Sequence, residues 1–187
     1  DSEFLRYLAV YPDGYNENQS YPVIILLHGF GSYMGDLSVL APAINQDNYI
    51  YIFPNAPIPI QVNPMFTGYG WTSPGNFNDP QELQYIRNLL HEFITEIQGK
   101  FNVRPGNAIL GGFSQGGVMS YLCALAKPEI FGGVIALSST LPSLTEIMDK
   151  LPETRTQPIF IAHGTHDEVI EIERGRNSKL FLESQGY

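Results

Sequence analysis

The sequence contains a single cysteine, Cys123, among its 187 residues. One cysteine cannot form an internal disulfide, so a small disulfide-stapled scaffold is excluded, and this cysteine usage fits a reducing compartment. Cys123 falls within the helix that we expect after Ser114. A small buried hydrophobe is the commoner role for a cysteine in such a helix, so we expect packing rather than thiol chemistry.

Long apolar runs and positive charge are also scarce. No apolar run approaches the roughly 20 residues that a membrane-spanning helix needs. Only 10 Lys and Arg residues face 19 Asp and Glu, and the net charge of -9 argues against nucleic acid or an anionic membrane as the main partner. Composition and length predict one soluble globular domain over residues 1–187 and a cytoplasmic location. The sequence begins at Asp1 rather than Met, and removal of a leader would be compatible with secretion.

Short apolar runs alternate with segments of helical periodicity from residue 20 onward. Strands are predicted over residues 4–11, 23–27, 49–53, 108–110, 134–137 and 159–162, and helices over 36–45, 79–99, 143–151 and 170–184. A further helix is predicted after Ser114, with its end just before Pro128. This alternation predicts the α/β class with a mostly parallel sheet. Ligands of such sheets bind outside the carboxyl ends of the strands.

Residues 55–79 show no clear periodicity and contain several prolines, glycines and aromatic residues. A loop of this length is uncommon in a compact domain unless it is functional, so we expect it to form part of a binding surface. A helix follows, because Asp79 can cap it, Pro80 suits its first turn and Glu82 is spaced to close a capping box. Gly99 is expected to end this helix.

Residues 112–116 read Gly-Phe-Ser-Gln-Gly, a G-x-S-x-G elbow between a predicted strand and a predicted helix. Gly112 and Gly116 allow the sharp turn, because a Cβ at either position would collide with the neighbouring strand or helix. The turn would expose the hydroxyl of Ser114 at the carboxyl end of the sheet. Ser114 is therefore the predicted nucleophile.

Two further strand ends carry residues that such a nucleophile requires. The backbone N–H of Gln115, directly after the serine, and that of Phe30, in the loop after residues 23–27, could stabilise the oxyanion. His28 is expected to order that loop. Asp167 follows the strand 159–162 and comes after the serine in the chain, so it is the predicted acid that orients an imidazole base.

Five segments together resemble the carboxylesterase/phospholipase family, which includes acyl-protein thioesterases and lysophospholipases. They are residues 27–31 (Leu-His-Gly-Phe-Gly), 53–57 (Phe-Pro-Asn-Ala-Pro), 112–117 (Gly-Phe-Ser-Gln-Gly-Gly), 137–139 (Leu-Ser-Ser) and 163–167 (His-Gly-Thr-His-Asp). The resemblance implies an α/β-hydrolase fold, a mostly parallel sheet with helices on both faces. It also implies a serine carboxylesterase that acts through an acyl-enzyme, without metal or cofactor, on a small ester, thioester or lysophospholipid.

The resemblance also implies roles for individual residues. Ser114 would be the nucleophile and Asp167 the triad acid, with the amides of Phe30 and Gln115 as the oxyanion hole. Trp71 resembles the tryptophan of the family's acyl-pocket segment, although the residues around it differ from the usual charged context. Glu168 stands where the family often has proline. The residues expected to bind substrate are Trp71, Met65, Phe66, Leu141 and Val169.

The general base is the main departure from the family pattern. In this family the triad histidine follows one more strand after the helix that ends near Ser184, so a C-terminal strand and helix are expected outside the 187 residues. His28, His91, His163 and His166 are all poorly placed to serve instead. One alternative is that the 187 residues belong to a longer enzyme. If instead the protein lacks that strand, an uncovered strand edge remains, and a partner chain could supply the missing strand in an oligomer. The other is a hydrolase-like binding or scaffold protein with an incomplete triad.

Overall fold

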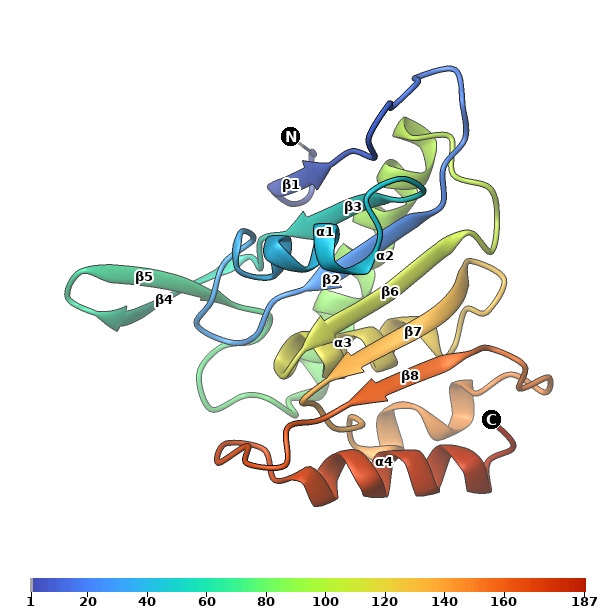
Figure 1. Ribbon diagram of the computed structural model, residues 1–187. Coiled ribbons are helices and arrows are strands. Elements are labelled where there is room, and N and C mark those ends of the chain that lie inside the picture. Colours follow the sequence, from blue (N-terminus) through green and yellow to red (C-terminus); the bar gives the residue numbers. More distant parts are fainter. Residues whose placement is uncertain (1) are drawn as a thin grey trace.

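The structure, a computed structural model, describes residues 2–187. Its main sheet has six strands in the order β1-β3-β2-β6-β7-β8 (Figure 1). These strands are β1 (Tyr7–Val10), β2 (Val23–Leu27), β3 (Ile50–Pro54), β6 (Ala108–Phe113), β7 (Phe131–Leu137) and β8 (Ile159–Ala162). β1 runs antiparallel to β3, and the other neighbours are parallel. The predicted mostly parallel α/β sheet is therefore confirmed.

Helices cover both faces of this sheet. A short 3-10 helix, Asp36–Val39, and α1 (Leu40–Ile44) lie on one face (Figure 1). The helices on the other face are α2 (Pro80–Lys100), α3 (Gln115–Ala124) and α4 (Ile172–Ser184). Within residues 2–187, no helix combines the length and apolarity needed to cross a membrane.

The central strand β2 shows why a continuous apolar run was required. All five of its residues are buried. Ile25 and Leu27 join the large core under α2 and α3, whereas Ile24 and Leu26 join the smaller core under α1. Because successive side chains of a strand point to opposite faces, a sheet covered on both faces needs apolar residues at every position.

The prediction of an irregular loop over residues 55–79 was wrong in part. β4 (Ile58–Asn63) and β5 (Phe66–Gly70) form a two-stranded antiparallel hairpin that projects from the body of the molecule (Figure 1). Pro59 is tolerated because a strand outside the main sheet need not donate every backbone hydrogen bond. Hydrogen bonds join Gly31 N to Tyr69 O and Tyr69 N to Ser32 O, so the base of the hairpin is tied to the loop after β2.

Asp79 caps α2 as predicted, but the helix does not end at Gly99 as predicted. The Asp79 carboxylate accepts hydrogen bonds from the N–H groups of residues 81 and 82. Glu82 does not close the predicted capping box, because its carboxylate accepts from Ser73 N and Asn76 Nδ2 instead. Gly99 lies inside the helix. Asn102 takes the left-handed conformation after the helix end, with φ of 49°.

Several other predicted boundaries shift. The segment 143–151 forms two short 3-10 helices, Leu144–Glu146 and Met148–Lys150, rather than one helix. The helix predicted from residue 170 begins at Ile172, because the carboxylate of Asp167 accepts the N–H groups of residues 169 and 170 in a turn before it. The strand predicted over 108–110 continues to Phe113.

Candidate active site

The carboxyl ends of β2, β6, β7 and β8 lie side by side along one edge of the sheet. Register pairs Leu27 with Gly112, Phe113 with Leu137, and Leu137 with Ala162. A cavity of about 240 Å³ lies at this edge. Apart from Phe113, which ends β6, its lining residues follow the four strands: Gly29, Phe30, Ser32, Asp36, Phe113, Ser114, Ser138, Asp167, Val169 and Ile170.

Ser114 forms a strained turn between β6 and α3. Its φ of 53° and ψ of -118° lie outside the regions that residues with a Cβ normally occupy. A Cβ built on Gly116 would lie 1.9 Å from Leu27 O, and one built on Gly112 would lie 2.3 Å from the carbonyl carbon of Gly116. The expected need for glycine on both sides of the serine is therefore confirmed.

Two backbone donors near Ser114 have no acceptor. Within residues 2–187, neither Phe30 N nor Gln115 N donates a hydrogen bond to another protein group. The next donor along the loop, Gly31 N, is engaged with Tyr69 O at 2.8 Å. The loop approaches the elbow closely, since a Cβ built on Gly29 would lie 3.5 Å from Ser114 Cβ. Free N–H groups beside a serine hydroxyl can accept the charge of a developing oxyanion.

His28 holds the loop that carries Phe30. The N–H of Ala56 donates to His28 Nε2 at 3.0 Å, so the proton of the neutral ring is on Nδ1, which donates to Gly29 O at 2.8 Å. Burial lowers the pKa of His28 and favours this neutral form. Trp71 Nε1 donates to His28 O at 2.8 Å. The histidine therefore has a structural position, as expected.

Asp167 presents an ionised carboxylate to the cavity. Its Oδ1 accepts hydrogen bonds from Val169 N and Ile170 N, both at 2.9 Å. These backbone donors, first that of Ile170, lower the pKa of the carboxyl group, and the Ser138 hydroxyl and His163 add to the shift. Asp167 can therefore orient and stabilise a cationic imidazole.

None of the four histidines is hydrogen-bonded to Ser114 in the described part of the chain. His163 Nε2 contacts Ile170 O at 2.6 Å and lies 3.7 Å from Asp167 Oδ2, with its ring buried under the loop. His166 is exposed and pairs with the hydroxyl of its neighbour, and His91 is exposed on α2. No nitrogen of these rings forms a hydrogen bond with Ser114 Oγ in residues 2–187.

The five residues predicted to bind substrate lie in different places. Val169 lines the cavity and is 90% exposed. Trp71 is buried beneath the loop, with 1% of its surface exposed. Met65, in the turn of the hairpin, is 93% exposed, and Phe66 beside it packs edge-on against Tyr33. Leu141 packs against the main core. The structure therefore brings only Val169 to the cavity, and the roles of the other four remain predictions.

Several lining residues had no role in the sequence-based prediction. They are Ser32, Asp36, Phe113, Ser138 and Ile170, with Gly29 as a backbone neighbour. Ser138 had a signal in the sequence, because it directly follows the strand next to β6 and belongs to the segment 137–139. In the structure its φ is 45°, which is unusual for a serine. Asp36 had none, because an aspartate at the start of a short helix is normally a capping residue.

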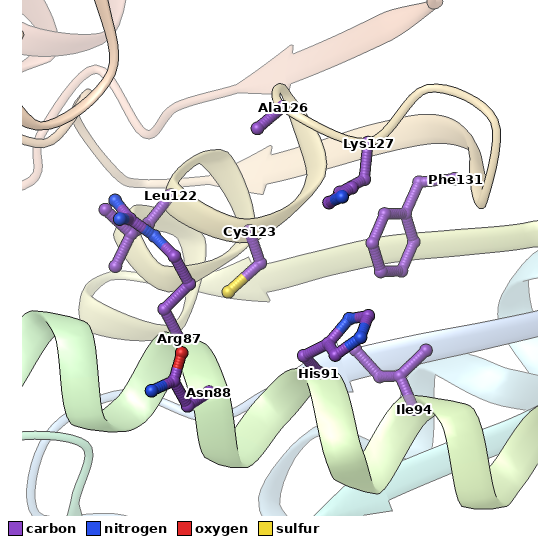
Figure 2. Close-up of a pocket in the computed structure, with 9 residues that line it drawn as sticks. All are labelled: Arg87, Asn88, His91, Ile94, Leu122, Cys123, Ala126, Lys127 and Phe131. Atoms are coloured by element: carbon purple, nitrogen blue, oxygen red, sulfur yellow. The ribbon is translucent and has the colours of Figure 1, made fainter. Parts of the chain in front are cut away.

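A second cavity of about 240 Å³ lies between α2 and α3 and contains the cysteine (Figure 2). Cys123 and His91 both line it, a pairing that could indicate a thiol nucleophile. Burial raises the pKa of the Cys123 thiol to about 12, so the thiolate is scarce at neutral pH. The predicted packing role of Cys123 fits this environment.

Comparison with known proteins assigns the family. The profile of the phospholipase/carboxylesterase family matches residues 15–186. The chain belongs to this family. Acyl-protein thioesterase 1 of Candida albicans is 31% identical, with 92% of this chain and 81% of that protein covered. Acyl-protein thioesterase 1 of Emericella nidulans is 33% identical, with 87% and 76% covered. The chain is therefore a carboxylesterase-type hydrolase, as predicted.

Solved structures confirm the α/β-hydrolase fold of this phospholipase/carboxylesterase member. Esterase PE8 superposes with a TM-score of 0.78 at 21% identity, with 97% of this chain and 85% of that chain covered. Acyl-protein thioesterase 2 of Zea mays gives 0.72 at 20% identity, with 98% and 86% covered. At these identities the likeness supports the fold, whereas chemistry must be argued from the site.

Proposed function

We propose that the protein hydrolyses carboxylic esters or thioesters with Ser114 as the nucleophile. The observation that carries this proposal is the strained Ser114 turn, which holds the hydroxyl beside two free backbone N–H groups and in the same cavity as Asp167. Small acyl compounds are the proposed substrates. The acyl-protein thioesterase relatives favour thioesters among them.

In the first half of the reaction, Ser114 Oγ attacks the acyl carbonyl carbon and transfers its proton to a histidine base. The carbonyl oxygen becomes negative, and the N–H groups of Phe30 and Gln115 donate to it. When the tetrahedral intermediate collapses, the bond to the alcohol or thiol breaks, and the leaving group takes the proton from the imidazolium. An ester between Ser114 and the acyl group remains.

In the second half, the same base removes a proton from water, and the resulting oxygen attacks the Ser114 ester. The same two N–H groups hold the second oxyanion. Its collapse releases the carboxylic acid and returns the proton to Ser114 Oγ. Throughout, Asp167 stabilises the imidazolium that forms twice in each cycle.

The base of this mechanism is proposed to be a fifth histidine, from outside the 187 residues. The argument rests on the positions of the four that are present. Both ring nitrogens of His28 and the Nε2 of His163 contact backbone atoms. His91 lies on α2, in a different cavity, and the exposed His166 pairs with the Thr165 hydroxyl. A segment that places an imidazole between Asp167 and Ser114 would complete the triad, whether it belongs to this chain or to an associated one.

The decisive experiment uses the full-length protein with an activated thioester and a fluorophosphonate probe. We expect a burst of thiol release equal to the enzyme concentration and stoichiometric labelling of Ser114. Ser114→Ala should abolish both. Ser143→Ala is the matched control, because Ser143 is exposed and contacts only Thr145 through its side chain.

Two outcomes would contradict the proposal. Turnover that survives in Ser114→Ala would show that the nucleophile is a different residue. Absence of both burst and labelling in the folded full-length protein would favour the alternative, a binding or scaffold protein with an incomplete triad.

A further inference from the structure

The cavity around Ser114 is lined by negative charge and by no positive charge. Asp36 and Asp167 are its only charged lining residues in the described part of the chain. Asp167 is neutralised in the proposed mechanism by the imidazolium that it stabilises. Asp36 has no cationic partner within salt-bridge distance in residues 2–187. Its carboxylate is oriented by Ser32, whose hydroxyl donates to Oδ2 at 2.8 Å.

Another cavity, different from the one between α2 and α3, adjoins the Ser114 cavity, and its charged lining residues are also mainly acidic. It has a volume of about 430 Å³ and shares Val169 and Ile170 with the first. Its charged lining residues are Glu168, Glu171 and Arg174. Together the two cavities are lined by three carboxylates without a proposed catalytic role, those of Asp36, Glu168 and Glu171. The only cationic group among the lining residues of the described chain is the guanidinium of Arg174.

We propose that Asp36, supported by Glu168 and Glu171, makes the site selective for substrates with a cationic group close to the scissile acyl bond. An anionic group at the same distance is disfavoured. The inference rests on the proposed function, because it names the charge of the substrate of that same site. It assigns Asp36 as a specificity-determining residue that does not touch the reacting atoms.

The physical basis is the field of fixed charges at the mouth of a concave site. Carboxylates along one wall raise the local concentration of cations and lower that of anions, and low-dielectric walls focus the field. The same field acts on the bound substrate over several ångströms. Because Asp36 is exposed, salt screens much of the effect beyond about 8 Å at physiological ionic strength. The selectivity should therefore be moderate and should fall with added salt.

The test compares three thioesters with the same acyl group in the full-length protein. S-butyryl thiocholine carries a cationic leaving group, and S-butyryl 3,3-dimethylbutanethiol has the same shape without charge. S-butyryl 2-mercaptoethanesulfonate carries an anionic group. The three thiols also differ in pKa, so each kcat/KM is divided by the rate constant for alkaline hydrolysis of the same thioester. At low ionic strength we expect the corrected values to fall in that order, with the cationic substrate about fivefold or more above the anionic one. Added sodium chloride should narrow the ratio.

The variant Asp36→Asn tests the assigned residue. Its amide oxygen can still accept from Ser32, so the loop should keep its conformation, and the cationic-to-anionic ratio should fall about threefold. Asp47→Asn is the matched control, because Asp47 is exposed and precedes β3, at the opposite end of the sheet. It should leave the ratio unchanged.

The outcomes separate this inference from the proposed function. Equal hydrolysis of all three thioesters, or an unchanged ratio in Asp36→Asn, would overturn the role of Asp36 while the esterase mechanism stands. Failure of the folded protein to hydrolyse any of the three would overturn the proposed function and this inference with it.

Discussion

The side-chain carbonyl of Gln115 accepts a hydrogen bond from the backbone N–H of Trp71 at 3.0 Å. The amide nitrogen of the same side chain donates to Thr72 Oγ1 at 2.8 Å, and Gln115 is 8% exposed. Gln115 directly follows Ser114, and Trp71 directly follows β5. One buried side chain therefore connects the turn that carries the proposed nucleophile to the segment that follows the hairpin.

Replacement of Gln115 by leucine should test this connection. Leucine has a similar size but leaves the N–H of Trp71 and the hydroxyl of Thr72 without partners in a buried region. We expect the free energy of unfolding to fall by about 1–3 kcal/mol. The backbone N–H of residue 115 is a proposed oxyanion donor, so kcat/KM should fall by about tenfold or more as the turn loses its anchor.

Urea denaturation and steady-state kinetics measure these two effects. Gln84→Leu is the control, because Gln84 is exposed on α2 and its change should stay within about 0.5 kcal/mol. Equal losses of stability in the two variants would show that the buried amide contributes nothing specific.

The stability of the protein should depend on pH through His28. Burial lowers the pKa of His28 in the folded protein, so the unfolded chain takes up a proton at higher pH than the folded protein does. The stabilisation is complete above the ordinary histidine pKa of about 6.5. It is lost as the pH falls below that value, by at most about 1.4 kcal/mol per pH unit.

Urea denaturation between pH 5 and pH 8 measures this slope. His28→Gln should flatten this slope, whereas His91→Gln should not, because His91 is solvent-exposed in the folded protein. Asp167 acts in a different window: its lowered pKa contributes stability that is lost only below the ordinary aspartate range near about 3.9. A slope that persists in His28→Gln above pH 5 would assign it to another group.

The turn at Ser114 and the positions of the strand ends were predictable because their causes are local or topological. The glycines at 112 and 116 are dictated by close backbone approach, and parallel strands bring their carboxyl ends to one edge whatever the loops do. Local sequence also indicated that none of the four histidines would serve as the base. Two follow strands in turns, one adjoins Asp167 in the chain and one lies on a helix away from the strand ends.

The hairpin was not predicted because two glycines interrupt the strand pattern of β5. These glycines are required by contacts with a distant part of the chain, which the local sequence does not reveal. A Cβ on Gly68 would lie 1.8 Å from Gly31 O, and one on Gly70 would lie 2.8 Å from the Phe30 ring. β5 therefore lacks side chains where it crosses the loop after β2, and its alternating pattern is interrupted. Apolar residues at 58, 60 and 62 did alternate, but Pro59 between them argued against a strand.

Asp167→Asn should separate the charge of the proposed triad acid from its structural role. Asparagine can keep the hydrogen bonds from Val169 N and Ile170 N, so near pH 7 the protein should stay folded and lose only the stability that the charge of the carboxylate adds to those bonds. Loss of the carboxylate should lower kcat by about 10³- to 10⁴-fold, because the imidazolium is no longer stabilised. Fluorophosphonate labelling and kinetics of the full-length protein measure this, with the exposed Asp149→Asn as control.

Two glycines in helices provide a matched test of the packing behind Ser114. Gly116 lies in α3, where an added Cβ would meet Leu27 O at 1.9 Å, a backbone atom that cannot swing aside. Gly99 lies in α2 with no atom within 4 Å of an added Cβ. Gly116→Ala should therefore lower the free energy of unfolding by about 3 kcal/mol or more, whereas Gly99→Ala should raise it by about 0.5 kcal/mol through helix propensity.

Urea denaturation measures the change in the free energy of unfolding of each variant, including its sign. Circular dichroism shows whether Gly116→Ala folds at all. The difference between them is informative even if that variant is recovered only partly folded, because the two substitutions are chemically identical and both lie in helices. Similar effects on stability would mean that α3 can move away from β2 at little cost. In that case the strained conformation of Ser114 would not be imposed by the contact between Gly116 and Leu27.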